Sequence, residues 1–86
     1  MYNYRLSKTV IKFLEKRDQA FLLRFDKKFD EIIENPIKST ADVQPYIGHP
    51  WHYRLRIGKY RFLYAILEEE IVVYFYDADS RGGIYK

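Results

Sequence analysis

Apolar and polar side chains alternate through the stretch Trp51-His52-Tyr53-Arg54-Leu55-Arg56-Ile57-Gly58-Lys59-Tyr60-Arg61-Phe62-Leu63-Tyr64-Ala65. Alternation of this kind is typical of β-strands that have one buried and one open face. Gly58-Lys59 interrupts the pattern. Glycine at the first position of a two-residue loop favours a type II′ turn, whose twist matches the strands that it joins. The stretch therefore predicts a β-hairpin with its turn at Gly58-Lys59.

The predicted turn determines which residues lie opposite each other in the hairpin. One face carries apolar cross-strand pairs: Ile57 with Tyr60, Leu55 with Phe62, and Tyr53 with Tyr64. On the other face Arg56 lies opposite Arg61, and Arg54 follows along the strand. Like charges directly opposite each other on a sheet are destabilising. We therefore expect this face to bind an anion.

Length and composition narrow the class of protein. The chain has 86 residues and no cysteine, so we expect one domain, 1–86, without disulfides or thiolate metal sites. We expect no metal and no cofactor. The first residues lack the apolar segment of a signal peptide, and no apolar run approaches the ~20 residues that span a bilayer. These features predict a soluble, cytoplasmic protein without a membrane partner.

Charge is distributed unevenly, although the net charge is only +3. Residues 51–65 contain four basic and no acidic side chains, whereas residues 68–79 contain five acidic and no basic ones. A local basic patch attracts polyanions such as nucleic acids. The alternative interpretation is that the basic side chains only form a solvated face of the sheet.

Two helices are predicted before the hairpin. Ser7 is a candidate N-cap for a helix over residues 8–16, whose apolar positions cluster at helical spacing. Asp18 is a candidate N-cap for a longer helix that runs to about Glu34. Asn35-Pro36 ends it, because the residue before proline avoids the helical conformation.

The remaining segments complete an α+β fold. Residues 2–6 predict a first strand, and the apolar run 71–76 predicts a central strand that is covered on both faces. Residues 37–50 have the composition of a loop, which Tyr46 and Ile47 are expected to anchor on the core. The predicted order is strand, helix, helix, strand, strand, strand, with the helices packed on one twisted, mainly antiparallel sheet. The first strand pairs in parallel, because two helices supply the long connection that a parallel pair requires.

This order, together with the Tyr-Arg-Leu-Arg-Ile-Gly-Lys-Tyr-Arg hairpin at 53–61 and the closing Arg-Gly-Gly-Ile-Tyr-Lys at 81–86, resembles the RelE/ParE toxin superfamily. The resemblance covers essentially the whole chain. It implies a toxin of a type II toxin–antitoxin module with the RelE-like fold and a cognate antitoxin as partner. RelE-like members cleave mRNA, typically in the ribosomal A site, without a metal.

The resemblance also implies roles for individual residues. Arg54 and Arg56 would position the RNA, and Arg61 would stabilise the phosphate. Arg81 and Tyr85 would complete the catalytic site. Two further residues are candidates for substrate binding: Trp51, which is placed to stack an unpaired base, and His52, which shares a strand face with Arg54 and Arg56.

One departure from the family leaves the general base open. RelE itself has lysines where this chain has Arg54 and Arg56. A desolvated lysine can lose its proton, whereas arginine in practice cannot. Tyr85 and His52 are therefore the alternatives for the base, and the simpler interpretation of His52 is a partly exposed strand residue.

Two other functions fit the same fold. A ParE-like toxin poisons DNA gyrase and is not a nuclease, but such chains generally lack the full set of basic residues and the terminal tyrosine. The other alternative is a non-catalytic module that binds nucleic acid or protein. The arginines at 54 and 56, where RelE has lysines, leave this alternative open.

Overall fold

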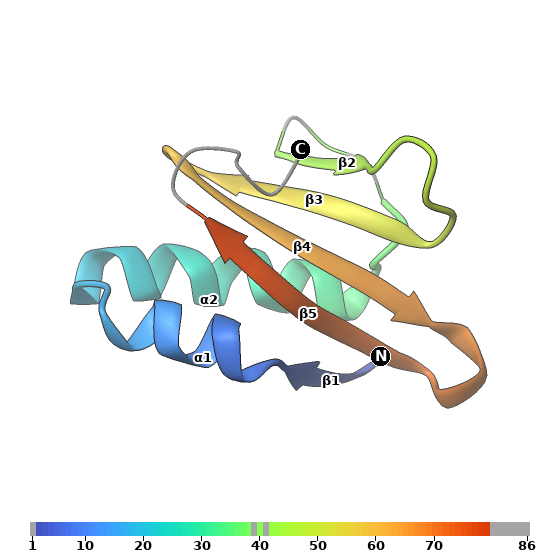
Figure 1. Cartoon of the computed structure of the whole chain (residues 1–86), viewed down its shortest axis with the longest axis horizontal. Coiled ribbons are helices and arrows are strands. Elements are labelled where there is room, and N and C mark those ends of the chain that lie inside the picture. The colour runs from blue at the N-terminus through green and yellow to red at the C-terminus, as the bar shows by residue number, and fades with distance from the viewer. Residues whose placement is uncertain (1, 39, 41, 80–86) are drawn as a thin grey trace.

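The computed structural model describes residues 2–38, 40 and 42–79, and these form a five-stranded sheet with two helices (Figure 1). The elements follow in this order: β1 (Asn3–Leu6), α1 (Lys8–Glu15), α2 (Gln19–Glu34), β2 (Val43–Pro45), β3 (His52–Ile57), β4 (Tyr60–Leu67), a 3₁₀ turn at Glu68–Glu70 and β5 (Val72–Asp79). The strand order across the sheet is β1-β5-β4-β3-β2. β1 pairs with β5 in parallel, and every other pair is antiparallel. The predicted α+β class and the parallel pairing of the first strand are confirmed.

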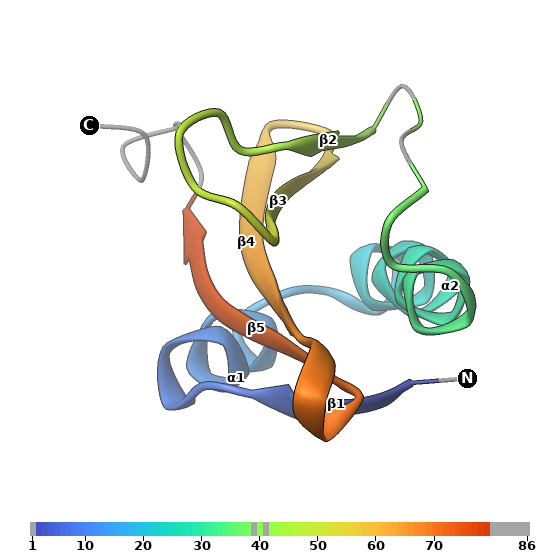
Figure 2. The ribbon, with the colours of Figure 1, turned by 90° about the vertical axis from the view of Figure 1, so that its right-hand side faces the viewer.

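Both predicted helix starts are confirmed. The hydroxyl of Ser7 accepts a hydrogen bond from the Val10 backbone N–H at 3.1 Å, and Asp18 Oδ1 accepts one from the Phe21 N–H at 2.9 Å. Such caps satisfy backbone donors that lack a partner within the first turn. A short connection joins α1 to α2; both helices run along the sheet in Figure 1, and Figure 2 shows them well apart from each other.

The core lies between the helices and one face of the sheet. Its centre is aromatic, and Phe62, Tyr64 and Phe75 are fully buried there. The helices contribute apolar side chains to the same cluster: Val10, Phe21, Phe25, Ile32 and Ile33. Large rings bury much area per residue, which a chain of this length needs for stability.

The hairpin forms in the predicted register. Ile57 lies opposite Tyr60, Leu55 opposite Phe62 and Tyr53 opposite Tyr64, while Arg56 lies opposite Arg61. Gly58 has φ +61°, the value that a type II′ turn requires at its first position. The apolar pairs belong to or pack on the core, so alternation places the arginines on the face that points away from the helices.

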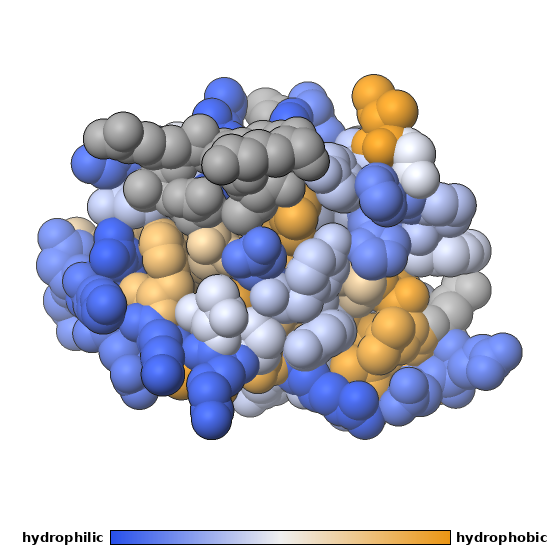
Figure 3. All heavy atoms as spheres, viewed as in Figure 1, coloured by the Kyte–Doolittle hydropathy of each residue, from blue (hydrophilic) through white to orange (hydrophobic). Residues whose placement is uncertain are grey.

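Three predictions need correction. Residues 37–50 contain a strand, because β2 pairs with β3 between Val43 and Leu55. Ile47 does not anchor this segment; its side chain is 93% exposed, and Figure 3 shows an apolar projection over the loop between β2 and β3. β4 is the central strand, and β5 lies between β4 and β1. The apolar run correctly predicted an interior strand, but it could not distinguish two interior positions, and only one face of β5 is in the core, because Tyr74 and Tyr76 on its other face are half-buried.

No helix within the described ranges is long and apolar enough to cross a membrane. The closing segment 81–86 lies outside the described residues.

Replacing Tyr64 with phenylalanine is expected to lower the free energy of unfolding by about 1–3 kcal/mol. The Tyr64 hydroxyl donates a hydrogen bond of 2.9 Å to the backbone carbonyl of Pro36, and both residues are fully buried. Phenylalanine would leave that carbonyl without its donor. Urea denaturation followed by circular dichroism measures the change. Tyr53→Phe removes the same atom from a half-buried neighbour and serves as the control; equal stability of Tyr64→Phe and wild type would contradict the prediction.

The same two variants give a prediction for alkaline pH. Burial, and secondarily Tyr53, raises the pKa of Tyr64 above its usual value. Above pH ~10 the unfolded chain therefore releases a proton that the folded chain keeps, and stability falls as the pH rises. Tyr64→Phe is expected to remove this part of the fall, and Tyr53→Phe is expected to retain it.

Candidate functional site

A polar pocket lies on the face of the sheet that points away from the helices. It has a volume of about 170 Å³ and is lined by five side chains: Asp42, Gln44, Arg54, Arg56 and Arg61. They come from β2, β3, β4 and the residue before β2. We call this site the arginine pocket. Its three guanidinium groups and one carboxylate give it a positive charge, as an anion-binding site requires.

Arg61 is the most unusual member of the pocket. Its side chain is half-buried, and its Nη1 atom is buried without a hydrogen-bond partner among the described residues. A buried donor that lacks a partner is unfavourable by about 1–3 kcal/mol in a folded protein. A phosphate oxygen at this atom would accept the hydrogen bond and balance the charge.

Arg54 and Arg56 are held by partners from β2 and the residue before it. Arg54 Nη2 donates a hydrogen bond of 2.7 Å to Gln44 Oε1. Arg56 Nη2 lies 3.8 Å from Asp42 Oδ1, and the Arg56 backbone N–H donates to the Asp42 carbonyl at 2.8 Å. These contacts orient both side chains beside Arg61. Asp42 also forms an ion pair of 3.1 Å with Lys28 on α2.

Asp42 and Gln44 were not among the predicted site residues. They were missed because residues 37–50 were interpreted as a loop, so nothing placed them beside the hairpin. The polar-apolar-polar order of Asp42-Val43-Gln44 is the alternation of a short strand and indicates one at this place. Pro45 directly after it is common on edge strands, and β2 is an edge strand.

His52 lies on the same strand face as the arginines and interacts with β5. Its Nδ1 atom is 2.8 Å from the hydroxyl of Tyr76, within hydrogen-bond distance. Burial, and then the neighbouring His49, lowers the pKa of His52, so its imidazole is neutral near pH 7. Burial, followed by Tyr46 and Asp77, raises the pKa of Tyr76, so its hydroxyl keeps its proton and can donate it to Nδ1.

The other predicted site residues lie elsewhere. Trp51 is 50% exposed but lines a different pocket, of about 390 Å³, at the loop between β2 and β3. Arg81 and Tyr85 lie outside the described residues. The structure therefore brings together Arg54, Arg56 and Arg61 in one pocket and places His52 further along the same strand, where it lines a second pocket together with Trp51.

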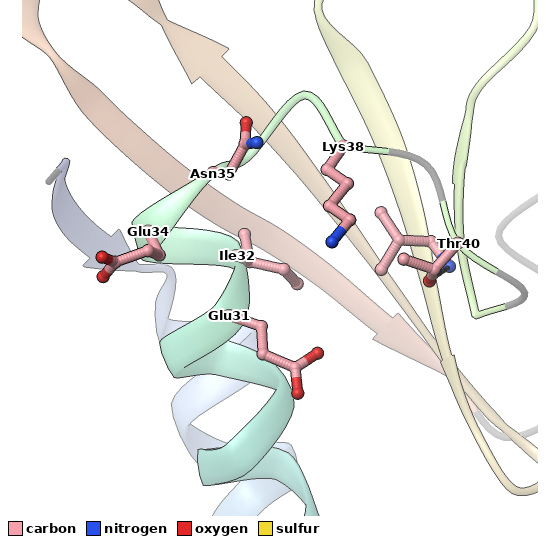
Figure 4. A pocket seen from close by; sticks show the side chains of 7 residues that line it. Glu31, Ile32, Glu34, Asn35, Lys38 and Thr40 are labelled. Atoms are coloured by element: carbon pink, nitrogen blue, oxygen red, sulfur yellow. Dashed lines mark hydrogen bonds between the residues drawn. The ribbon is translucent and has the colours of Figure 1, made fainter.

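A larger pocket of about 360 Å³ lies at the end of α2 and is a poor phosphate site (Figure 4). Glu31 and Glu34 line it together with Lys38. The C-terminal end of a helix carries partial negative charge, which repels anions. The described residues also contain no group of three or more His, Cys, Asp or Glu side chains that is placed to hold a metal ion.

Comparison with known proteins identifies the family. A family described as the ParE toxin of the type II toxin–antitoxin system parDE matches residues 4–83. The chain belongs to the RelE/ParE toxin superfamily. The putative toxin RelE1 of Methanocaldococcus jannaschii is 30% identical over 86 residues, which cover 99% of this chain and 96% of that protein.

Solved structures of RelE proteins share the fold. The isolated E. coli RelE toxin matches with a TM-score of 0.82 and 22% identity, over 94% of this chain and 85% of that chain. The RelE–RelB complex of Pyrococcus horikoshii OT3 matches with a TM-score of 0.81 and 27% identity, over 95% of this chain and 97% of that chain. The expected RelE-like fold is confirmed.

Proposed function

We propose that this RelE/ParE-superfamily toxin is a metal-independent endoribonuclease that cleaves mRNA, with the ribosomal A site as the place of cleavage. The observation that carries the proposal is the buried, unpaired Nη1 of Arg61 in a pocket with two further arginines. Such a site suits a group whose negative charge increases during the reaction. A cognate antitoxin is the proposed protein partner, because several structural neighbours are described as toxin–antitoxin complexes.

The proposed reaction uses the RNA's own 2′-hydroxyl as nucleophile. The 2′-oxygen attacks the adjacent phosphorus, and the bond from phosphorus to the 5′-oxygen of the next nucleotide breaks. The 2′-proton passes to a base, and the leaving 5′-oxygen accepts a proton. The products are a 2′,3′-cyclic phosphate and a 5′-hydroxyl. The guanidinium of Arg61 would bind the doubly charged phosphorane, since arginine is planar, permanently charged and bidentate towards phosphate.

Arg54 and Arg56 would bind the scissile phosphate and its neighbour without acting as bases. Tyr85 and His52 remain the two candidates for the base, and Arg81, four positions before Tyr85, is a further candidate phosphate ligand. The lowered pKa keeps His52 neutral, as a base must be, but Nε2 is free to accept the 2′-proton only in the tautomer whose Nδ1–H donates to the Tyr76 hydroxyl.

Cleavage is expected to continue undiminished in EDTA and to leave a 2′,3′-cyclic phosphate on the upstream fragment. The arginine pocket supplies the charge that a metal ion supplies in other nucleases. Mass spectrometry of the fragments of a ribosome-bound mRNA identifies the chemical groups at the new 3′ and 5′ ends. Fragments with 3′-hydroxyl ends would contradict the proposed chemistry. The EDTA arm uses free RNA, because ribosomes themselves need Mg²⁺ to stay assembled, and activity there that EDTA removes and Mg²⁺ restores would also contradict it.

A second candidate is a ParE-like toxin that inhibits DNA gyrase, and the match to the ParE family over residues 4–83 favours it. Two assays separate the candidates. Primer extension on mRNA from expressing cells maps cuts that a nuclease makes, and a supercoiling assay with purified gyrase detects its inhibition. Intact mRNA together with loss of supercoiling would replace the first proposal by the second.

A further inference from the structure

Four rings form a continuous row from the loop between β2 and β3, across β3, to β5. The ring centroids of Tyr46 and His49 are 4.8 Å apart and nearly parallel at 11°. Those of His49 and His52 are 5.8 Å apart, and those of His52 and Tyr76 are 5.5 Å apart. We call these four residues the aromatic row. They come from three separate segments, and no residue of the row belongs to the core cluster.

The row is accessible from solvent. His49 is exposed, and the three other rings are half-buried. The adjoining pocket of about 390 Å³ is lined by the whole segment 45–53, which includes the half-exposed Trp51. Buried aromatic rings stabilise a core, but a group of exposed rings around a pocket is typical of a binding site.

The loop that carries half of the row is held in a defined shape. The Tyr46 N–H donates to the His52 carbonyl at 2.8 Å, and the His49 N–H donates to the Tyr46 carbonyl at 3.1 Å. Trp51 has φ +67°, an unfavourable conformation for a residue with a side chain. The hydrogen bonds hold the backbone of this loop in one shape before any ligand binds, which reduces the backbone entropy lost on binding.

The row adjoins the arginine pocket along one strand. His52, Arg54 and Arg56 follow each other on one face of β3. Successive side chains on one face of a strand are about 6.6 Å apart, close to one nucleotide of an extended single strand. The segment 45–53 contains no acidic residue, so nothing in it repels phosphate. An RNA strand held by the arginines would therefore pass its next bases over the row.

We propose that the aromatic row, with Trp51, is a stacking site for unpaired nucleobases next to the phosphate in the arginine pocket. Stacking on aromatic rings is the common way in which proteins bind single-stranded RNA, and it tolerates any base because every base has a π-face. The inference rests on the proposed nuclease function, since it assigns the substrate's bases to a second part of the same surface.

The test compares two oligonucleotides of equal charge. One is a fluorescein-labelled ten-residue 2′-O-methyl RNA, which has no free 2′-hydroxyl to attack. The other has the same backbone with abasic positions. Fluorescence anisotropy gives the Kd of each for the purified chain. We expect the base-containing strand to bind at least about tenfold more tightly, because each stacked base adds a factor of about 5 or more.

Variants assign that difference to the row. His49→Ala is expected to weaken binding of the base-containing strand about fivefold and to leave the Kd of the abasic strand unchanged. His49→Phe keeps a flat ring and is expected to restore the affinity. Leu23→Ala changes a 60% exposed apolar side chain on α2, outside both pockets, and is the matched control, with no expected effect on either strand.

The outcomes separate this inference from the nuclease proposal. If the wild-type chain binds both strands with equal affinity and Arg61→Ala binds neither, base stacking is overturned and the phosphate site is retained. A base-dependent difference in a chain that cuts no mRNA would support the stacking site and overturn the nuclease. Failure of both strands to bind would overturn the stacking site, whereas the nuclease is tested by the map of mRNA cuts.

Discussion

Arg61→Ala is expected to lower mRNA cleavage at least about 100-fold while the chain remains folded. Removing one preorganised donor that stabilises developing negative charge lowers turnover about 100- to 1000-fold in enzymes where this has been measured. Arg61 is the pocket residue whose buried Nη1 has no partner among the described residues, and in the proposed function a phosphate oxygen would accept its hydrogen bond. Primer extension on mRNA from cells that express each variant measures the loss.

The control for this prediction comes from the other end of the sheet. Arg5 on β1 is exposed and forms an ion pair of 3.1 Å with Glu70. Arg5→Ala removes the same charge far from the pocket, because β1 and β4 are separated by β5. We expect Arg5→Ala to cleave mRNA and to arrest growth as wild type does. Growth arrest by Arg61→Ala equal to that of wild type would contradict the role of Arg61.

Stability distinguishes a functional loss at Arg61 from unfolding. A buried donor without a partner destabilises the folded state, so its removal is expected to leave the free energy of unfolding unchanged or to raise it. Replacing a functional-site residue commonly removes activity while the free energy of unfolding stays the same or rises. Arg61→Lys keeps the charge but loses the planar, bidentate group, and an intermediate cleavage rate is expected.

The arginine face was predictable because two independent features of the sequence agree on it. Alternation through residues 51–65 assigns each side chain to a face, and Gly58-Lys59 sets the register. A slip of one residue would exchange the faces and bury the arginines, which is unfavourable enough to exclude that alternative. Arg56 opposite Arg61 therefore followed from local sequence alone.

The partners of the arginines were not predictable in the same way. β2 has three residues, too few for its alternation to stand out from a loop that also contains Pro45, Gly48 and Pro50. Its pairing with β3 joins residues that are about ten positions apart in sequence, such as Gln44 and Arg54. Only this pairing places Asp42 and Gln44 against the arginines.

An irregularity that local sequence does not reveal lies next to the contact between His52 and Tyr76. β4 and β5 shift register between Leu63 and Tyr64, so Leu63 lies opposite Asp77 whereas Tyr64 lies opposite Phe75. Tyr76 is the additional residue of this bulge. Bulges redirect side chains next to functional sites, and this one leaves Phe75 in the core while the Tyr76 hydroxyl reaches His52.

Phe62→Ala is expected to lower the free energy of unfolding by about 3–5 kcal/mol. Phe62 is fully buried, and its ring contacts aromatic rings of both helices and of β5: Phe13, Phe21, Phe25 and Phe75. Alanine would leave a cavity that these rings cannot fill without leaving their own contacts. The loss is a large part of the 5–15 kcal/mol that stabilises typical small proteins, and thermal denaturation followed by circular dichroism measures it.

Ile47→Ala is the control for Phe62→Ala, because it removes an apolar side chain that is 93% exposed and is expected to leave stability unchanged. Phe62 and Arg61 are adjacent in β4 but point to opposite faces of the sheet. We therefore expect both alanine variants to lose toxicity for different reasons, Phe62→Ala with loss of folded structure and Arg61→Ala without it. A fully stable Phe62→Ala would contradict the aromatic core, and an unfolded Arg61→Ala would mean that the arginine supports the fold and not the chemistry.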